Sequence, residues 1–437
     1  MSHDTIKFLN LEDVAPLIET IDVSKRNNVI YSHITLVKQD QSCPVCGSAD
    51  CVVHDYRLKK IVHSVSTSSP CFILYKARRY RCKLCDKNFY EKNPFSNNGH
   101  KGSTYTLLSV LNSLRSHTST FTSVGLQYNL TKQTVMNIFD DYVDCSKKVF
   151  SNIICIDEFY TAKVSSTKYA CVIVDFMSKQ ILEVYRSRHM YFLANRFTAL
   201  PETERDNVKA VVIDMWETYK DLTRRFFKQA IIAVDSFHVI KHLNDAMIRI
   251  RIRIMQKFNH QTSKLITNDM YYYMLKKFHY FFVKNFEDIY PGDIKIPKIH
   301  AKWKKQEILK YLLSIDDDLK YAYLLKEAYR EFNTTSEFDS CDLEFDSFIN
   351  QFCNSHLAEF REFGDLLRRW KVEIKNSFLR IGHRRLSNGA VEGINSRIKT
   401  IIKNANGYSN FNRLRNKIMY SLNFHEPILG SPKKNEE

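Results

Sequence analysis

Three aspartates, Asp157, Asp214 and Asp235, each end a run of apolar residues in the middle of the chain. An aspartate in that position often caps a helix or a turn, so each one alone indicates little. If the three runs were strands ending at one edge of a sheet, their carboxylates would repel one another unless a divalent cation joined them. Carboxylates around two Mg²⁺ ions are a common arrangement for breaking and forming phosphodiester bonds.

A fourth acid, Glu392, stands alone in a basic segment. Between Ile374 and His425 the chain has ten Lys or Arg residues and no other Asp or Glu. The stretch SNGAVEGINSRIKT, residues 387–400, predicts a helix that Asn388 caps, with Glu392 in the first turn, where the helix dipole favours an acid. A solvated glutamate would fit this pattern too, but two aspartates are too few to hold two metals, so we interpret Glu392 as the third ligand. The basic residues assigned to DNA phosphates around it are Arg384, Arg385, Arg397 and Lys399.

The apolar runs predict the elements that would position these acids. Runs at 151–159, 169–175 and 180–185 are joined by short connections, which predicts three antiparallel strands. A helix at 190–200, a strand at 208–214, a helix at 217–228 and a strand at 229–235 are expected to follow. This is the element order of the ribonuclease H-like fold. Its first, fourth and fifth strands run parallel, so the three aspartates are expected at one edge of the sheet.

The same fold distinguishes Asp214 from Asp235. The fourth strand lies beside the first, whereas the fifth lies one place further out. Neighbouring strands are about 4.8 Å apart and second neighbours nearly 10 Å apart, so carboxylates on adjacent strands share a metal more easily. We therefore predict that Asp157, Asp214 and Glu392 are catalytic and bind two Mg²⁺ ions, for which Mn²⁺ can substitute. Asp235 and His238 are predicted as accessory or alternative catalytic residues, and Asp214 could instead cap the helix that follows it.

Two CxxC motifs predict a zinc site in the N-terminal third. Cys43, Cys46, Cys82 and Cys85 offer four thiolates, and a filled Cys₄ shell leaves no open position, so the zinc would be structural. The 35 residues between the motifs exceed the usual ribbon loop, but residues 71–82 have the composition of a strand, which fits an enlarged hairpin. Other cysteines and histidines here lack the spacing but are alternative ligands: Cys51, Cys71, His54 and His63. Basic residues of the hairpin could contact phosphates: Lys76, Arg78, Arg79 and Arg81.

Residues 101–148 predict a helix-turn-helix domain. The pattern indicates helices at 121–128 and 132–143, with Thr131 capping the second. The predicted buried stripe is Val135, Ile138, Phe139 and Tyr142. The outward residues that would face DNA are Lys132, Gln133 and Asn137. Any three-helix bundle has this pattern, so the zinc ribbon before it and the charge of the chain support the DNA-binding interpretation.

Composition favours a polyanionic partner. The chain has 65 basic and 48 acidic residues, a formal net charge of +17. Nucleic acid is therefore the leading partner, although a basic enzyme of another kind shares this composition. No apolar run of about 18 residues and no signal peptide are recognisable, so we expect a cytoplasmic protein whose cysteines stay reduced. Trp303, in the segment after the fifth strand, could stack on an unpaired base, although a core or surface tryptophan is the more ordinary role.

Taken together, these residues resemble the bacterial insertion-sequence transposases of the ISL-three family. The resemblance runs from Cys43 to about residue 424 and rests on the paired CxxC motifs, the helix-turn-helix and five short stretches. These are IDEF, IDMWETY, DSFHVIKHLN, SNGAVEGINSRIK and NGYSNFNRLR. The resemblance implies DDE chemistry, with Asp157 and Glu392 as first and last catalytic acids and with Asp235 and His238 matching a D-x-x-H element. It also implies that the ribbon and helix-turn-helix bind terminal inverted repeats.

The expected fold class is a multidomain α+β chain. The predicted boundaries are an N-terminal arm at 1–40, a zinc ribbon at 41–98, a helix-turn-helix at 101–148, a ribonuclease H-like core at 149–238, an all-helical insertion at 239–375, final core helices at 376–425 and a tail at 426–437. We expect a bacterial, nucleoid-associated DNA transposase acting on double-stranded DNA as a homodimer or higher oligomer. The alternatives are a DNA-binding regulator with an inactive catalytic fold and a metal-dependent nuclease without strand transfer.

Overall fold

The computed structural model describes residues 3–96, 101–161, 164, 167–259, 266–289, 292–423 and 426–429. Most of the predicted tail lies outside the described residues. The chain forms two compact units. The first comprises Met1–Lys147, Phe159–Ala170 and Ile394–Glu437, and the second comprises Lys148–Glu158 and Cys171–Gly393.

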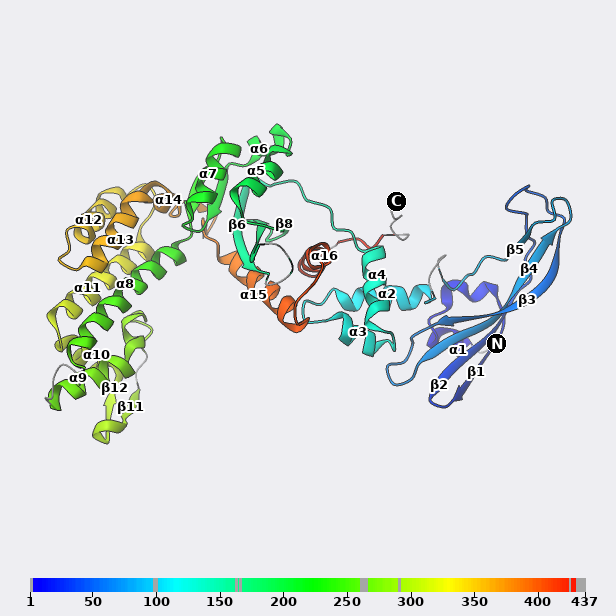
Figure 1. Ribbon diagram of the computed structural model, residues 1–437, viewed down its shortest axis with the longest axis horizontal. Coiled ribbons are helices and arrows are strands. Elements are labelled where there is room, and N and C mark those ends of the chain that lie inside the picture. The colour runs from blue at the N-terminus through cyan, green and yellow to red at the C-terminus, as the bar shows by residue number, and fades with distance from the viewer. Residues whose placement is uncertain are drawn as a thin grey trace. The chain divides into compact units, whose positions relative to one another are not determined.

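The first unit begins with a five-stranded sheet (Figure 1). Its strands are β1 (Ile18–Arg26), β2 (Val29–Leu36), β3 (Cys51–Val62), β4 (Cys71–Cys82) and β5 (Asn88–Tyr90), in the order β1-β2-β4-β3 with β5 paired to β4. Strands β3 and β4 form the enlarged hairpin that the sequence predicted. Strand β2 comes from the segment predicted as an N-terminal arm, yet it pairs in parallel with β4. The arm is therefore part of the ribbon's sheet.

One face of this sheet is buried. Its core contains Ile34, Ile61, Ile73 and Tyr75, together with Leu9 from the N-terminal segment. Helix α1 (His3–Phe8) and the short 3₁₀ helix η1 (Glu12–Leu17) precede β1. Fully buried residues of β4 largely alternate with more exposed ones because successive side chains of a strand point to opposite faces.

The helix-turn-helix follows as α2 (Thr104–Leu114), α3 (Phe121–Gln127) and α4 (Lys132–Tyr142). Thr131 caps α4, as predicted, by accepting a hydrogen bond from the backbone N–H of Thr134 at 3.1 Å. The whole predicted stripe of α4 is buried. Gly125 makes the turn possible, because a Cβ there would lie 2.8 Å from the carbonyl oxygen of Leu130.

The last two helices are α15 (Gly389–Asn404) and α16 (Phe411–Leu422), and from Ile394 onward they belong to the first unit. The hydroxyl of Tyr420 in α16 donates to the carbonyl of Leu111 in α2 at 3.0 Å. Its ring lies 5.8 Å from that of Phe139 in α4. The buried ammonium of Lys417 donates to the carbonyl of Ser116 at 3.0 Å. The sequence assigned α16 to the catalytic domain, whereas its buried face completes the core of the helix-turn-helix.

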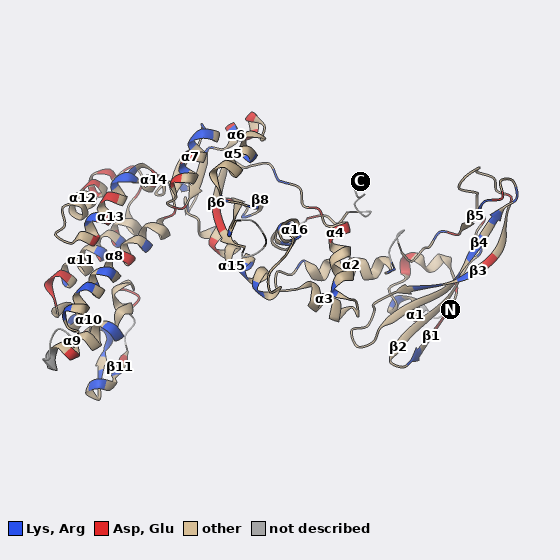
Figure 2. Cartoon of the chain, viewed as in Figure 1, with Lys and Arg blue, Asp and Glu red and all other residues tan. Residues whose placement is uncertain are grey.

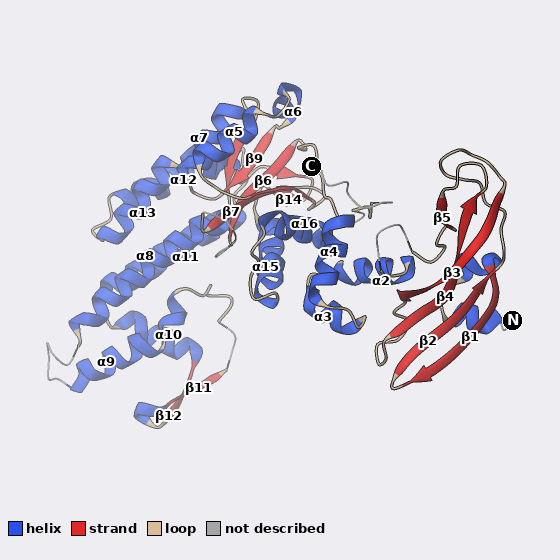
Figure 3. Cartoon of the chain, turned by 45° about the vertical axis from the view of Figure 1, so that its right-hand side comes forward, coloured by secondary structure: helices blue, strands red, loops and turns tan. Residues whose placement is uncertain are grey.

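The second unit contains the other five-stranded sheet (Figure 3). Its strands are β6 (Ile153–Tyr160), β7 (Tyr169–Asp175), β8 (Ile181–Tyr185), β9 (Ala210–Ile213) and β10 (Ile231–Val234), in the order β10-β9-β6-β7-β8. Strand β9 pairs in parallel with both β6 and β10, and β7 pairs antiparallel with β8. Helices α5 (Met190–Thr198), α6 (Glu202–Asn207) and α7 (Glu217–Phe226) lie between β8 and β10 in the chain. This is the strand order predicted for a ribonuclease H-like core, and the mixed α+β class is confirmed.

An insertion follows β10. It consists of α8 (Ser236–Lys257), α9 (Ile266–Lys277), η2 (His279–Phe282), β11 (Asp293–Ile296), η3 (Pro297–Ile299), β12 (Ala301–Lys304), α10 (Lys305–Ser314), α11 (Asp317–Thr335), α12 (Asp342–Cys353), α13 (Ala358–Arg369) and α14 (Lys371–Asn376). The hairpin of β11 and β12 interrupts the helices, so the insertion is not all-helical as predicted. Side chains along β12 alternate between half-buried and exposed, the pattern of a strand rather than of a helix. A second small hairpin, β13 (Arg380–Ile381) and β14 (Arg384–Arg385), leads to α15.

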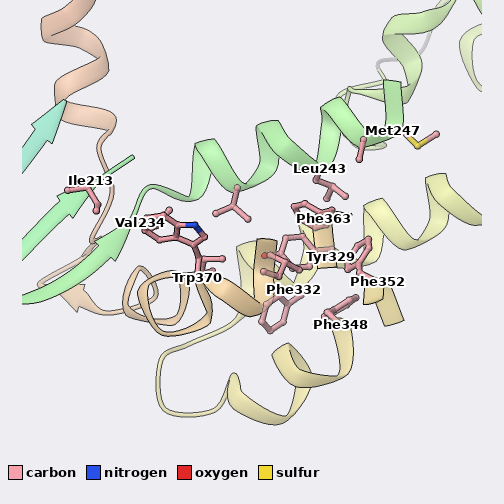
Figure 4. Packing of buried hydrophobic residues seen from close by; sticks show 14 of the residues in the cluster. Ile213, Val234, Leu243, Met247, Tyr329, Phe332, Phe348, Phe352, Phe363 and Trp370 are labelled. Atoms are coloured by element: carbon pink, nitrogen blue, oxygen red, sulfur yellow. The ribbon is translucent and has the colours of Figure 1, made fainter. Parts of the chain in front are cut away.

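One apolar core connects the insertion to the catalytic sheet. It runs from Ile213 and Val234 on the sheet, through Leu243 on α8, to aromatic rings of α11, α12 and α13 (Figure 4). Tyr329 of α11 is fully buried and lies edge-on to Phe352 of α12, with ring centroids 5.7 Å apart. The sheet and the insertion therefore share a hydrophobic core.

Candidate functional site

The four predicted acids all lie in the second unit. Asp157 lies within β6, Asp214 follows β9 directly, Asp235 is the N-cap of α8, and Glu392 is in the first turn of α15. The parallel register pairs Ile156 with Ile213, so the next residues along the two strands are Asp157 and Asp214. Asp235 follows β10, one strand further from β6.

The carboxylates influence one another's ionisation. Burial, then the charge of Asp214, raises the pKa of Asp157 to about 8. Burial, then the charges of Glu158 and Asp235, raises the pKa of Asp214 to about 7, and Glu392 adds to this shift. The pKa of Glu392 is itself raised by burial and then by the charge of Asp235. Each of the four acids therefore interacts electrostatically with at least one of the others, and these repulsions favour their neutral forms.

Asp214 and Asp235 have different partners. The Nε2 atom of His238 lies 3.1 Å from Oδ1 of Asp214. Asp235 uses Oδ1 to accept the backbone N–H of Phe237 at 3.4 Å, which caps α8. Its Oδ2 atom is buried and has no hydrogen-bond partner among the described residues. Burial is also the first cause of the raised pKa of Asp235.

The donor set of this cluster fits Mg²⁺. Carboxylate oxygens are the protein ligands that Mg²⁺ prefers, and a cation would relieve both the repulsion between the acids and the burial of an unpaired oxygen. In the described part of the chain no three of these acids bring ligand atoms within 4.8 Å of one another. Sharing one ion would therefore require their side chains to rotate inward.

Sequence reasoning missed an arginine beside the acids. Arg188 forms an ion pair with Glu158, and its guanidinium lies 4.6 Å above the ring of Trp216. Glu158 comes one residue after Asp157, within IDEF, and Trp216 comes two residues after Asp214, within IDMWETY. The sequence motifs could therefore have indicated both residues. Arg188 had no local signal, because it comes from the loop after β8.

Asn388 organises the start of the helix that carries Glu392. It is buried, and its backbone carbonyl accepts the N–H groups of Val391 at 2.8 Å and Glu392 at 3.2 Å. Its polar groups also lower the pKa values of Asp214 and Asp235 against the larger effect of burial. Asn388 thus adjoins three of the acids and holds the backbone of Glu392 through its carbonyl, whereas its side chain does not form the predicted cap, since neither of its polar atoms has a hydrogen-bond partner among the described residues.

The four predicted zinc ligands lie together in the first unit. Cys43, Cys46, Cys82 and Cys85 bring their sulfur atoms within 4.8 Å of one another. The distances from Cys43 to Cys85 and from Cys46 to Cys82 are both 3.5 Å. Zinc–sulfur bonds of about 2.3 Å in a tetrahedron place the sulfurs about 3.8 Å apart, so this group could hold a structural zinc. Hydrogen bonding from the backbone of Cys85 is the main cause that lowers the pKa of Cys82 to about 6, which favours the thiolate.

The alternative ligands have other surroundings. His63 is buried and contacts the carbonyl of Leu9 at 2.6 Å and the hydroxyl of Ser103 at 2.8 Å. The thiol of Cys71 donates to the carbonyl of Ser69. His54 lies beside Asp55. None of these residues, nor Cys51, belongs to the described cysteine group.

Removing a zinc ligand is expected to unfold the ribbon. Cys43→Ser or Cys85→Ser should lose bound zinc and weaken DNA-end binding, because structural zinc supplies much of the folding free energy of so small a unit. Cys51→Ser is the matched control and should keep its zinc. Elemental analysis of protein purified under reducing conditions provides the measurement. A parent protein without zinc would contradict the assignment.

The residues of the first unit that were predicted to contact DNA differ in their solvent exposure. Lys132, Gln133 and Asn137 are exposed on α4, and Gln133 donates to Asn137 at 2.7 Å. Arg78 is buried, paired with Glu91 at 3.1 Å and bonded to backbone carbonyls of the ribbon. Arg78 is therefore better explained as a structural residue that ties β2 to β4 than as a phosphate contact.

The neighbouring arginines of β4 are more accessible. Arg79 pairs with Asp55 at 3.3 Å, and Arg81 pairs with Asp86 on the surface. Surface pairs of this kind contribute little to stability, so these arginines could leave their partners at small cost. Figure 2 shows further basic residues along the ribbon strands.

The basic residues near Glu392 also divide into two kinds. Arg397 and Lys399 are exposed on α15, and Arg384 is exposed with its guanidinium 4.8 Å from the ring of Phe176. Arg385 instead donates to the backbone carbonyls of Asn333, Thr334 and Ser336. Its guanidinium is held within the protein, so a structural role explains Arg385 better than contact with DNA.

A ribonuclease H-like sheet with acids at the ends of adjacent strands defines the class of this fold and site. The model of the DDE transposase family of the ISL-three (ISL3) type, described as Transposase, matches residues 154–418. This match covers more than half of the chain and includes all four acids, and the chain belongs to this transposase family. A search of curated proteins found no match. Among the described residues, no helix combines the length and the apolar character needed to cross a membrane.

Proposed function

We propose that the chain is a DNA transposase that binds the terminal inverted repeats of an insertion sequence, cleaves the element's ends with Mg²⁺ and joins them to target DNA. The observation that carries this proposal is the placement of Asp157 and Asp214 at matching ends of adjacent parallel strands, with Asp235 after the next strand. Family membership supports the same reaction class. The net charge of +17 suits a substrate whose backbone is anionic.

The proposed roles follow from the positions of the residues. Asp157, Asp214 and Glu392 would hold Mg²⁺, which activates the attacking oxygen and stabilises the leaving one when bound. His238 orients Asp214 through their 3.1 Å contact. Asp235 fixes the start of α8 and is proposed as an accessory acid.

The two chemical steps balance without a further reactant. In cleavage, water attacks the phosphorus at the element's end, the bond to the 3′ oxygen breaks, and that oxygen leaves as a hydroxyl. In strand transfer, this 3′ hydroxyl attacks a phosphodiester of the target, and a target 3′ oxygen leaves. One phosphodiester bond forms and one breaks, so no external energy source is needed.

DNA recognition is assigned to the first unit. Exposed residues of α4 would contact the terminal repeats, and the zinc ribbon would add backbone contacts through Arg79 and Arg81. Arg384, Arg397 and Lys399 would hold phosphates around Glu392. Since two ends must be brought together before joining, the working form is proposed to be a homodimer or a higher oligomer.

A strand-transfer assay with oligonucleotides of the element's ends tests the proposal. The full chain is expected to release a 3′ hydroxyl and to join it to target DNA in Mg²⁺, and to do neither in EDTA. Binding without cleavage would identify a regulator with an inactive catalytic fold. Cleavage without a joined product would identify a nuclease, and either outcome would overturn the proposal.

A further inference from the structure

A cavity of about 850 Å³ lies in the helical insertion of the second unit. Its walls come from α8, the segment 285–287, α10 and α11. This volume is in the range of sites that take a small organic ligand, roughly 300–1,000 Å³. The proposed reaction leaves the cavity without a role.

Apolar and aromatic side chains form much of the wall. Ile240 and Leu309 line the interior, and Phe286 and Leu324 are 56% and 55% exposed. The backbone N–H of Phe286 donates to Oε2 of Glu327 at 3.2 Å, which fixes the segment that carries this ring. A solvent-exposed aromatic ring on a fixed backbone can stack on a planar group of a ligand.

The polar groups of the wall argue against a phosphate. Three carboxylates line the cavity, those of Glu287, Glu327 and Glu331, against two cations. A phosphate would be repelled by this excess of negative charge. Amide side chains also line the wall, from Asn285, Gln306 and Asn333. Amides and carboxylates are the groups that pair with the edges of nucleobases.

One wall helix of the cavity, α8, begins directly after one of the acids, Asp235. Ile240 lies five residues after Asp235 on the same helix, a rise of about 7.5 Å, or roughly two nucleotide steps of DNA. On the other side, Arg385 holds the carbonyl of Asn333, a lining residue, and precedes Glu392 by seven residues. The helix α8 therefore carries a wall residue and starts at Asp235, and Arg385 connects the wall to the hairpin that precedes the helix of Glu392.

We infer that this cavity receives one nucleobase unstacked from the DNA next to the scissile phosphate, with Phe286 as its stacking partner. The inference rests on the proposed function, since it assumes that DNA ends reach the acids. Stacking on an aromatic ring would offset the loss of stacking within the duplex. Trp303, which the sequence suggested for this role, lies edge-on to Tyr311 at 5.3 Å and packs against the apolar core.

A double-mutant cycle between protein and DNA tests the inference. Element-end duplexes are prepared with an abasic site at each position near the scissile phosphate in turn. The affinities and cleavage rates of the full-length parent and Phe286→Ala are then measured on every duplex. At one position, removal of the base should cost the parent roughly tenfold in affinity and should cost Phe286→Ala almost nothing, because both changes remove the same stacking contact.

Tyr321→Ala is the matched control, because Tyr321 is an exposed aromatic residue of α11 outside the cavity wall. This variant should behave like the parent at every position. Two outcomes would overturn the inference. In the first, Phe286→Ala lowers the affinity for every duplex by the same factor relative to the parent; in the second, Phe286→Ala itself still loses affinity when any one base is removed. If the parent binds no end duplex at all, the proposed function fails and the inference with it. Thermal melting of both variants establishes that they are folded.

Discussion

Asp214→Asn is expected to abolish cleavage and to lose bound Mn²⁺, whereas Asp235→Asn keeps its metal. Strand β9 lies directly beside β6, so Asp214 and Asp157 occupy neighbouring strands, while Asp235 follows the strand beyond. Losing a metal ligand should lower the cleavage rate roughly a thousandfold or more, because bound metal contributes several kcal/mol to transition-state stabilisation. Both variants are assayed for cleavage and for Mn²⁺ binding in the presence of DNA.

The metal measurement separates the two possible assignments. If both variants are inactive but only Asp214→Asn loses metal, Asp214 is the ligand and Asp235 is essential for another reason, such as capping α8. If Asp214→Asn still cleaves while Asp235→Asn is inactive and metal-free, the assignment is wrong. Asp214 would then act through its contact with His238.

Glu392→Gln should eliminate cleavage and leave DNA binding within about twofold of the parent. The amide preserves the shape of the side chain and removes the charge that would neutralise a metal ion. Glu392 belongs to the coupled acid cluster, since the charges of Asp235 and Glu392 raise the pKa values of neighbouring acids. Gel-shift and cleavage assays on the same end duplex provide the two readouts.

Glu344→Gln is the control for this experiment. Glu344 is also an exposed first-turn glutamate, at the start of α12, and it lies outside the acid cluster. Its replacement should leave both binding and cleavage unchanged. Cleavage by Glu392→Gln at a rate within a few-fold of the parent would remove Glu392 from the proposed ligands.

Elements with a strong local pattern were predictable from the sequence. The bounds of β4 match the predicted run 71–82, because the run is rich in residues that favour strands, alternates in part between apolar and polar residues, and ends at a cysteine. The cap of α4 was predictable since a threonine before an amphipathic helix has a local physical role. The strand order of the catalytic sheet followed from the order of its runs, because connections in a ribonuclease H-like fold leave few alternatives.

Features that depend on distant partners were not predictable. The parallel pairing of β2 with β4 joins segments about 40 residues apart, and nothing within β2 specifies its neighbour. Arg78 and Arg385 have the composition of DNA contacts, but carboxylates and carbonyls elsewhere in the fold engage them. Among the site residues, strand ends indicated where the acids would lie, while Arg188 required the tertiary structure.

The packing of α16 against α2 and α4 has a consequence for how such genes can change. The proposed DNA-recognition module would be encoded in two separate parts of the gene, because helices α2 and α4 share a core with α16 near the C-terminus. If related elements exchanged the 5′ third of the gene, α2 and α4 of one protein would have to pack against α16 of another. On the proposed function, we therefore expect new end specificities to arise by point substitutions on the exposed face of α4 rather than by exchange of gene segments.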